Sequence, residues 1–242
     1  MKKETKKIYW DRYWTKGNLN YNEKIIQIIK KKFPIKGLKV LEVGAGSGAT
    51  SLFLADNGAE VTALDYSEES INLMKKNNIN KSKIKLVHGD AFQMPFDNDQ
   101  FDLVFSQGLI EHYRDPERII KEKKRVTRKG GYILIDVPQV YNFYTVKKNI
   151  LMLFNKWFPG WETSFSRKRL ENLVRSCGLS VERCYAYGHF HNFFRIQEKL
   201  FHRKIVPDFM ARFYNCLWQA YEKTPLSLYT LFCIIVLARK DM

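Results

Sequence analysis

The chain has 242 residues, of which 45% are hydrophobic and 14% aromatic. This length suits one α/β domain with additional segments, and this composition excludes disorder over most of the chain. The formal net charge is +16, made up of +8 in residues 1–36 (11 basic, 3 acidic), −1 in residues 37–138 (14 basic, 15 acidic) and +9 in residues 139–242 (16 basic, 7 acidic). Such a surplus is typical of proteins that bind nucleic acid or an anionic membrane surface, and a lysine-rich composition is the simpler explanation.

The four cysteines, Cys177, Cys184, Cys216 and Cys233, form no CxxC pair and have no histidine at metal-binding spacing. We therefore expect free, buried thiols, no disulfide framework and no metal site. The N-terminal segment lacks the apolar run of a secretory signal, and the apolar run 226–238 is too short for a membrane span. These features predict a cytoplasmic protein.

In chain order, the first predicted elements are helices over residues 5–16 and 20–33. From residue 38 onward, short apolar strands alternate with helices. We expect strands at 38–44, 60–67, 84–90, 101–107 and 132–138, helices at 47–57, 67–78 and 115–127, and a turn at 129–131. After residue 138 the pattern is less regular, with a helix at 166–177, a strand at 179–188, mostly helical residues at 190–223 and a final strand at 228–240. The alternation predicts an α/β fold with a doubly wound, seven-stranded, mostly parallel sheet.

The first candidate binding site is the glycine-rich turn 42–48, EVGAGSG, between the first strand and the next helix. Glycines let a ligand approach the backbone closely, and the helix start offers free amides. The glycines alone also fit a dinucleotide-binding loop. The carboxylate of Glu42 argues against a pyrophosphate and favours a cationic ligand that carries an ammonium and a sulfonium.

Two further acids stand at the ends of the next two strands. Asp65 can accept hydrogen bonds from both hydroxyls of a ribose, since Ser67 suits the role of N-cap of the following helix. Tyr66 is placed to lie against an adenine ring. Asp90 can accept from the adenine amino group and the Ala91 N–H can donate to a ring nitrogen, although an Asx-turn explains Asp90 equally well. Three acids at successive strand ends point to one ligand site at the sheet edge.

Taken in order, the segments VLEVGAGSG, VTALDYS, HGDAFQMPF, FDLVFSQGLIEH and RVTRKGGYILIDVP resemble those of class I S-adenosylmethionine-dependent methyltransferases, most closely the type 11 subgroup that includes quinone-biosynthesis enzymes. The resemblance is close over residues 38–138 and looser over 166–188 and 227–240. It implies a Rossmann-like methyltransferase fold with helical substrate-cap elaborations, and S-adenosyl-L-methionine as cofactor.

Within a single domain, 1–242, the resemblance implies an N-terminal helical lid (1–37), a cofactor-binding core (38–138), and cap insertions with the final strands (139–242). The residues implied to contact the cofactor are Glu42, Gly44, Ala45, Gly46, Gly48, Asp65, Tyr66, Asp90, Ala91, Ser106, Gln107 and Tyr13. The aromatic residues of the lid are Tyr9, Trp10, Tyr13 and Trp14, and ordinary core packing is the simpler role for such a stripe.

Methyl transfer from a sulfonium depends mainly on positioning, so no catalytic residue is obligatory. A base is useful when the acceptor is a hydroxyl or an acidic carbon, and Glu111 and His112 after the fourth strand are the best-placed candidates. Alternatively, both only brace the helix that begins near Asp115. His189 and His191 are further candidates for the acceptor site.

The acceptor has to be inferred from segments 146–161 and 193–218, which mix aromatic, apolar and basic residues. Three acceptors fit: a small apolar or aromatic molecule, a lipid-like molecule at a membrane face, and RNA, which ranks third because no RNA-binding module is attached. The basic surplus suggests an anionic acceptor or a peripheral contact with an anionic membrane. A cofactor-binding regulatory or partner subunit without turnover, and a dinucleotide oxidoreductase, are the competing interpretations.

Overall fold

The computed structural model describes residues 7–15, 21–78, 84–157, 161–188, 216–217, 220–221 and 224–241. Its helices are α1 (Lys7–Trp14), α2 (Glu23–Lys32), α3 (Ala49–Asp56), α4 (Glu68–Asn77), α5 (Pro116–Val126), α6 (Phe143–Leu153), α7 (Arg167–Ser176) and α10 (Ser227–Thr230), with a 3₁₀ turn η1 (Ile110–His112). Its strands are β1 (Lys39–Val43), β2 (Glu60–Asp65), β3 (Ile84–His88), β4 (Phe101–Gln107), β5 (Thr127–Pro138), β6 (Ser180–Tyr187) and β7 (Cys233–Arg239).

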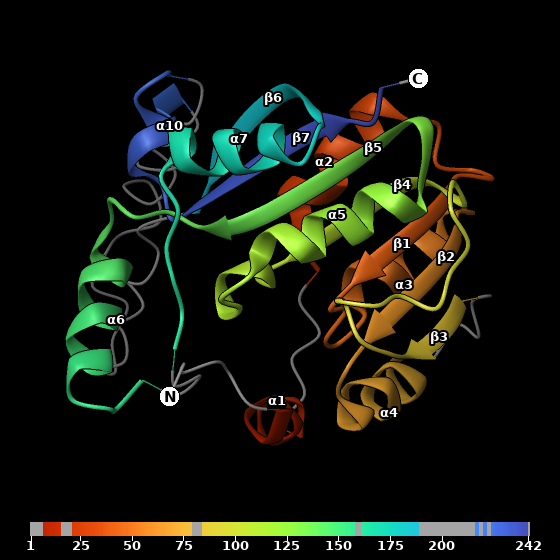
Figure 1. Ribbon diagram of the computed structural model, residues 1–242, viewed down its shortest axis with the longest axis horizontal. Coiled ribbons are helices and arrows are strands. Elements are labelled where there is room, and N and C mark those ends of the chain that lie inside the picture. Colours follow the sequence, from red (N-terminus) through yellow and green to blue (C-terminus); the bar gives the residue numbers. More distant parts are fainter. Residues whose placement is uncertain are drawn as a thin grey trace.

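The seven strands form one sheet with the order β3-β2-β1-β4-β5-β7-β6 (Figure 1). Strands β1 to β5 are parallel, and β7 runs antiparallel between β5 and β6. The strand order reverses between β1 and β4, because the chain first builds outward through β2 and β3 and then continues on the other side. The predicted doubly wound, mostly parallel sheet is thus confirmed, and its reversal point fixes where a ligand site is expected.

Helices cover both faces of the sheet (Figure 1). On one face, the amphipathic helix α2 buries Ile25 and Ile29 against Val40 of β1 and Phe105 of β4. On the other face, α5 packs over β4 and β5 and α7 packs over β6 and β7, in a second apolar layer. Both faces of the central strands are therefore buried, which explains their nearly continuous apolar sequence.

The structure differs from the predicted elements in three places. The turn expected at 129–131 lies inside β5, where the register with β4 jumps from the pair Phe101–Thr127 to the pair Leu103–Tyr132. The last strand starts at residue 233, because the short helix α10 precedes it. Helix α6 occupies part of the segment 139–165 for which the sequence indicated no element.

Some predictions fall on residues that the structure does not describe, including most of the helical segment 190–223, together with His189 and His191. Among the cysteines, Cys177 and Cys233 are buried as expected, whereas Cys216 is exposed. In the part of the chain that is described, no helix is long and apolar enough to cross a membrane. The same residues contain no cluster of three or more His, Cys, Asp or Glu suited to a metal ion.

Candidate functional site

A cavity lies at the carboxyl ends of the central strands, where the strand order reverses. Its volume is about 70 Å³. It is lined by Trp10, Trp14, Gly44, Leu64, Asp65, Tyr66, Gly89, Ala91, Gln107, Gly108, Leu109 and Tyr113. The structure therefore brings together Gly44, Asp65, Tyr66, Ala91 and Gln107 from the set of predicted cofactor residues.

The glycine-rich loop after β1 presents bare backbone at this cavity. Gly44, Gly46 and Gly48 have φ angles of 71°, 55° and 70°, in the left-handed region that favours glycine. A side chain at Gly46 would collide with the indole ring of Trp14, which packs directly on the loop. Ala45 is buried next to them. The indole ring of Trp14 thus already lies close to this backbone.

Asp65 at the end of β2 fixes the shape of the glycine-rich loop. Its Oδ2 accepts a hydrogen bond from the Gly46 amide, and its Oδ1 accepts one from the Ser67 amide, both at 2.8 Å. Ser67 caps α4, as predicted, by accepting from the Ser70 amide. Burial raises the pKa of Asp65, and the backbone hydrogen bonds oppose that rise. Each carboxylate oxygen retains a lone pair for a further donor from the cavity.

Glu42 does not line the cavity itself, but it is hydrogen-bonded to Gln107, which does. Gln107, at the end of β4, lines the cavity and donates from Nε2 to Glu42 Oε1 at 2.6 Å. Ser51 donates to the other oxygen of Glu42 at 2.6 Å. Burial raises the pKa of Glu42 to about 7. Glu42 itself does not line the cavity, so its role toward a cationic group stays a prediction that would require action through Gln107 or through the electric field.

At the third strand end, Ala91 lines the cavity and Asp90 does not. Asp90 is exposed, and its Oδ1 accepts from the Phe92 amide at 2.9 Å, which is the Asx-turn considered above. Tyr66 lines the cavity with a half-exposed ring that stacks near His88, at a centroid distance of 6.4 Å. The adenine-binding roles of Asp90 and Tyr66 remain predictions.

Helix α1 lies beside α4 (Figure 1), and two of its side chains line the cavity. Trp10 and Trp14 of the proposed aromatic lid line the cavity, whereas Tyr13 is exposed and packs edge-on against Trp14 at 4.8 Å. Ser67 donates to Asp11 Oδ1 at 2.6 Å and so joins α1 to the start of α4. Two of the four lid residues therefore lie at the site, and Tyr13 is not one of them.

Glu111 and His112 are both buried in η1, directly after β4. The Oε1 of Glu111 lies close to Gly108, which lines the cavity, and His112 Nε2 is 4.0 Å from the same Glu111 oxygen. Burial raises the pKa of Glu111 well above its usual value and lowers the pKa of His112 to about 4. The imidazole is therefore neutral at pH 7 and a weak base, contrary to its expected proton uptake near neutral pH. The ring also packs edge-on against Trp10 at 4.7 Å.

Residues 41–135 match the family model described as a methyltransferase domain. Demethylmenaquinone methyltransferase of Clavibacter sepedonicus is 34% identical over 102 residues, which cover 42% of this chain and 42% of that protein. The 2-methyl-6-phytyl-1,4-hydroquinone methyltransferase 1 of Oryza sativa subsp. japonica is 33% identical over 124 residues, which cover 50% and 37%. These matches support a class I S-adenosylmethionine-dependent methyltransferase domain over residues 41–135. Its match spans less than half the length of either relative.

The fold described above resembles those of solved structures over most of the chain. Magnesium protoporphyrin IX methyltransferase from Synechocystis PCC 6803 with bound SAH has a TM-score of 0.64 at 15% identity, covering 97% of this chain and 93% of that one. The [4+2]-cyclase SpnF has a TM-score of 0.60 at 16% identity, covering 91% and 82%. At these identities the likeness concerns the fold alone, and the cyclase illustrates that the fold carries more than one chemistry.

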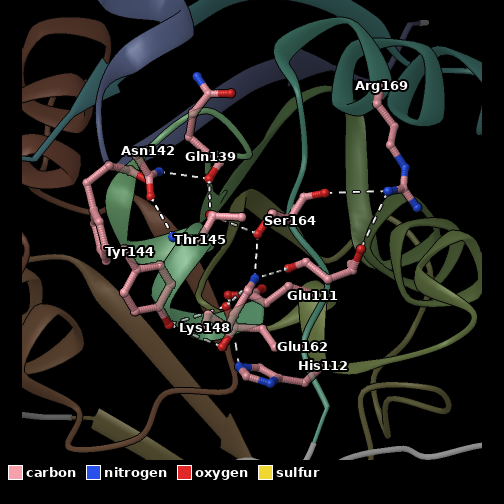
Figure 2. A network of polar contacts seen from close by, with 12 residues as sticks. Glu111, His112, Gln139, Asn142, Tyr144, Thr145, Lys148, Glu162, Ser164 and Arg169 are labelled. Atoms are coloured by element: carbon pink, nitrogen blue, oxygen red, sulfur yellow. Dashed lines mark hydrogen bonds and ion pairs between the residues drawn. The ribbon is translucent and has the colours of Figure 1, made fainter. Parts of the chain in front are cut away.

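Beside Glu111, the protein contains a buried ion pair that sequence reasoning missed (Figure 2). Lys148 Nζ of α6 lies 3.0 Å from Glu162 Oε1, with 0% and 3% of the two side chains exposed. Lys148 also donates to the carbonyl of Thr163 at 3.2 Å and to Ser164 Oγ. The Thr163 amide donates to the carbonyl of Glu111 at 2.9 Å. The pair thus ties α6 to η1, and its 14-residue separation leaves no local sequence signal.

A second missed group is Asp136, at the end of β5. Tyr187 donates to Asp136 Oδ2 at 2.6 Å, and Asn22 Nδ2 donates to the Tyr187 hydroxyl at 2.6 Å. The Oδ1 of Asp136 is buried and has no hydrogen-bond partner among the described residues. Burial raises the pKa of this carboxyl to about 7. The reasoning that located acids at the ends of the first three strands would also have located this one.

The side chain of Ser106 points away from the cavity, and the cofactor contact implied for its backbone stays a prediction. Its side chain is fully buried on the α5 side of the sheet and accepts a hydrogen bond from Lys123 Nζ. It does not line the cavity, whereas the adjacent Gln107 does. Successive strand residues point to opposite faces, so only one of these two side chains can reach the cavity.

We predict that Lys148→Ala lowers the free energy of unfolding by about 3–5 kcal/mol, because Glu162 is left buried without its cation. Replacing both partners by apolar residues, Lys148→Met with Glu162→Leu, should cost clearly less than Lys148→Ala. Urea denaturation at neutral pH measures both values. Lys147→Ala, at an exposed neighbouring position, is the control and should change stability by no more than about 0.5 kcal/mol. A Lys148→Ala effect as small as the control would contradict the structural role of the pair.

Proposed function

We propose that the protein transfers a methyl group from S-adenosyl-L-methionine to a small-molecule acceptor. The observation that carries this proposal is the cavity at the reversal point of the sheet, bordered by a bare glycine loop and by the carboxylate of Asp65, within a chain whose residues 41–135 match a methyltransferase domain. A dinucleotide is disfavoured because the carboxylate of Glu42 stands two residues before the loop that would have to hold a pyrophosphate.

The residues at the cavity fit this cofactor. The loop around Gly46 already accommodates a flat ring against its backbone, and the oxygens of Asp65 have capacity for the hydroxyls of a ribose. Gln107 would face the amino-acid portion, with the negative charge of Glu42 behind it. When bound, the cofactor supplies an activated methyl group on a sulfonium. The packing of Trp14 on Gly46 means that α1 has to adjust as the cofactor enters.

Glu111 is the residue that we assign to proton removal from the acceptor. It follows β4, its Oε1 lies beside the cavity-lining Gly108, and its Oε2 is buried with no hydrogen-bond partner among the described residues. A carboxyl kept from water with a raised pKa is a stronger base than an exposed one. The described acids near Glu111 do not favour an anionic acceptor at this point, so a neutral acceptor with a hydroxyl group fits better. The relatives named above act on quinone-type molecules, in agreement with such an acceptor.

A peripheral membrane contact is a further part of the proposal. Helix α6 is fixed on its inner side by Lys148, and its opposite side is apolar and exposed. The exposed apolar side chains at its outer face and end are Val146 (55%), Ile150 (53%), Leu153 (78%) and Phe154 (64%). Lys147 and Lys156 are exposed at the same helix, and the chain as a whole carries +16. An apolar helix face with basic neighbours on a cationic protein suits an anionic lipid surface, where a lipid-like acceptor would be found.

For the cofactor, we predict that isothermal titration calorimetry detects binding of S-adenosylhomocysteine and no binding of NAD. Asp65→Ala should weaken S-adenosylhomocysteine binding by about 1–3 kcal/mol, because charged hydrogen bonds are lost. Glu68→Ala, in the first turn of α4, is the matched control and should bind normally. Unchanged affinity of Asp65→Ala would contradict the ribose role, and NAD binding alone would overturn the assignment.

For the reaction, we predict that radiolabelled methyl groups pass from the cofactor to a small molecule of a cellular extract. Glu111→Gln should lower the transfer rate by about 100-fold or more, the usual contribution of a general base. Because ionised Glu111 is needed, kcat/KM of the wild type should rise with pH through the raised pKa of this carboxyl. Glu117→Gln, an exposed acid of α5, is the control. Absence of any labelled product would favour a binding subunit without turnover, and labelled RNA would favour the RNA alternative.

For the membrane contact, we predict sedimentation of the protein with vesicles that contain phosphatidylglycerol and much less with pure phosphatidylcholine vesicles. Leu153→Glu should abolish most of this binding, because it places a charge in the apolar face of α6. Asn172→Glu, at an exposed position of α7, changes the net charge by the same amount and should not reduce it. Equal recovery of wild type and Leu153→Glu with anionic vesicles would show that α6 is not the contact.

A further inference from the structure

Thr50 and Ser51 stand in the first turn of α3, directly after the glycine-rich loop, and both side chains are buried. Threonine and serine are weak helix formers, and a buried hydroxyl requires a hydrogen-bond partner. Neither hydroxyl caps the helix, because Gly48 occupies the N-cap position and makes no side-chain bond. The two hydroxyls are instead directed at the hydrogen-bonded pair of Glu42 and Gln107.

Gln107 is held by two acceptors through the same nitrogen. Its Nε2 donates to Glu42 Oε1 at 2.6 Å and to Thr50 Oγ1 at 3.0 Å. A side-chain amide has two N–H donors on its nitrogen and a carbonyl oxygen that only accepts. Both donors of Gln107 are therefore engaged, and Oε1 is its remaining polar atom. Since Gln107 lines the cavity and neither Glu42 nor Thr50 does, this carbonyl oxygen is the polar atom that Gln107 can offer to a ligand.

The orientation of this amide follows from the chemistry of its neighbours. An ionised Glu42 only accepts hydrogen bonds, so the reversed amide would place two acceptor oxygens against each other. Ser51 donates to the other carboxylate oxygen of Glu42 at 2.6 Å. The bonds from Ser51 and Gln107 favour the ionised form of Glu42 and oppose the effect of burial on its pKa. Thr50 is fixed from its far side, because its hydroxyl oxygen also accepts from the Asn22 amide at 3.3 Å.

A carbonyl oxygen in front of a buried carboxylate selects one kind of ligand group. An ammonium donates hydrogen bonds to the oxygen and is attracted by the negative charge of Glu42, whereas both would repel a carboxylate or a phosphate. The amino-acid end of the proposed cofactor carries an ammonium and a carboxylate on the same carbon atom. The orientation of the Gln107 amide therefore distinguishes between these two groups at this part of the cavity.

We propose that Thr50 is a positioning residue of the cofactor site: together with Glu42 it holds both N–H groups of Gln107, so that the carbonyl oxygen faces the cavity and accepts a hydrogen bond from the ammonium of the cofactor. Without the hydroxyl of Thr50, one N–H of Gln107 loses its acceptor, and the amide is free to turn its nitrogen toward the cavity. The inference rests on the proposed function for the identity of the ligand, and its test measures binding and does not require turnover.

Two analogues of S-adenosylhomocysteine separate the ammonium from the carboxylate. The adenosine thioether with an aminopropyl chain keeps only the ammonium, and the one with a carboxypropyl chain keeps only the carboxylate. The wild-type protein should prefer the aminopropyl analogue. Thr50→Val removes the hydroxyl and keeps the shape of the side chain. It should weaken binding of the aminopropyl analogue and of S-adenosylhomocysteine about three- to tenfold, the usual contribution of one hydrogen bond, and should not weaken binding of the carboxypropyl analogue.

Isothermal titration calorimetry, with competition against S-adenosylhomocysteine for weak ligands, measures these affinities. Thr50→Ser keeps the hydroxyl and should retain the wild-type preference, and Thr50→Ala replaces Thr50→Val if that variant does not fold. Thr62→Val, at a buried threonine of β2 that does not line the cavity, is the matched control and should leave the affinities unchanged. In the Gln107→Ala background, Thr50→Val should have no further effect on the preference.

The preference between the two analogues is the readout that a merely structural role would not move. Equal weakening of both analogues by Thr50→Val would overturn the inference, because general damage to the site affects every ligand. An unchanged affinity for both analogues would overturn it as well, since the hydroxyl would then not control the amide. If the wild-type protein does not bind S-adenosylhomocysteine, the proposed function itself is wrong, and this result is distinguishable because it appears before any variant is compared.

Discussion

The cavity depends on one interaction, the pair of backbone hydrogen bonds that Asp65 accepts. Through the Gly46 amide, the carboxylate holds the loop after β1 in its left-handed turns, and through the Ser67 amide it sets the start of α4. A single side chain at the end of β2 therefore positions the loop and helix on both sides of the cavity. Burial makes the charge of Asp65 costly, and the two amides offset this cost. A donor from a ligand would offset it further.

Much of this arrangement could be predicted from the sequence, because parallel strands bring their carboxyl ends to one edge. Apolar runs located the first four strands, and the residue after each run located Asp65, Ala91 and Gln107 at one site. The side chains of Asp90 and Ser106, at the same strand ends, do not line the cavity. A strand end fixes where a residue lies but not which way its side chain points, and Asp90 turned toward its own backbone while Ser106 faced α5.

The groups that the sequence did not reveal depend on contacts between distant segments. Lys148 and Glu162 meet because α6 folds back onto η1, a packing event without local periodicity. Lys123 is a different case, since its spacing from Ile119, Ile120 and Val126 follows the buried side of a helix. It stands within the basic run KEKKR, and a lysine in such a run is ordinarily expected to be exposed. Periodicity therefore carried more information about burial than residue type did.

The contrast between buried and exposed lysines changes how the net charge is interpreted. The surplus of +16 lies outside the central segment 37–138, and its described members include the exposed Lys147 of α6 and Lys156 just beyond that helix, where solvent and salt screen each charge. Lys123 and Lys148 are instead fully buried, where a charge acts strongly over short distances. The exposed lysines can thus affect which surface the protein meets, whereas the buried Lys148 acts on the acid packed against it, Glu162. Salt weakens the first kind of interaction much more than the second.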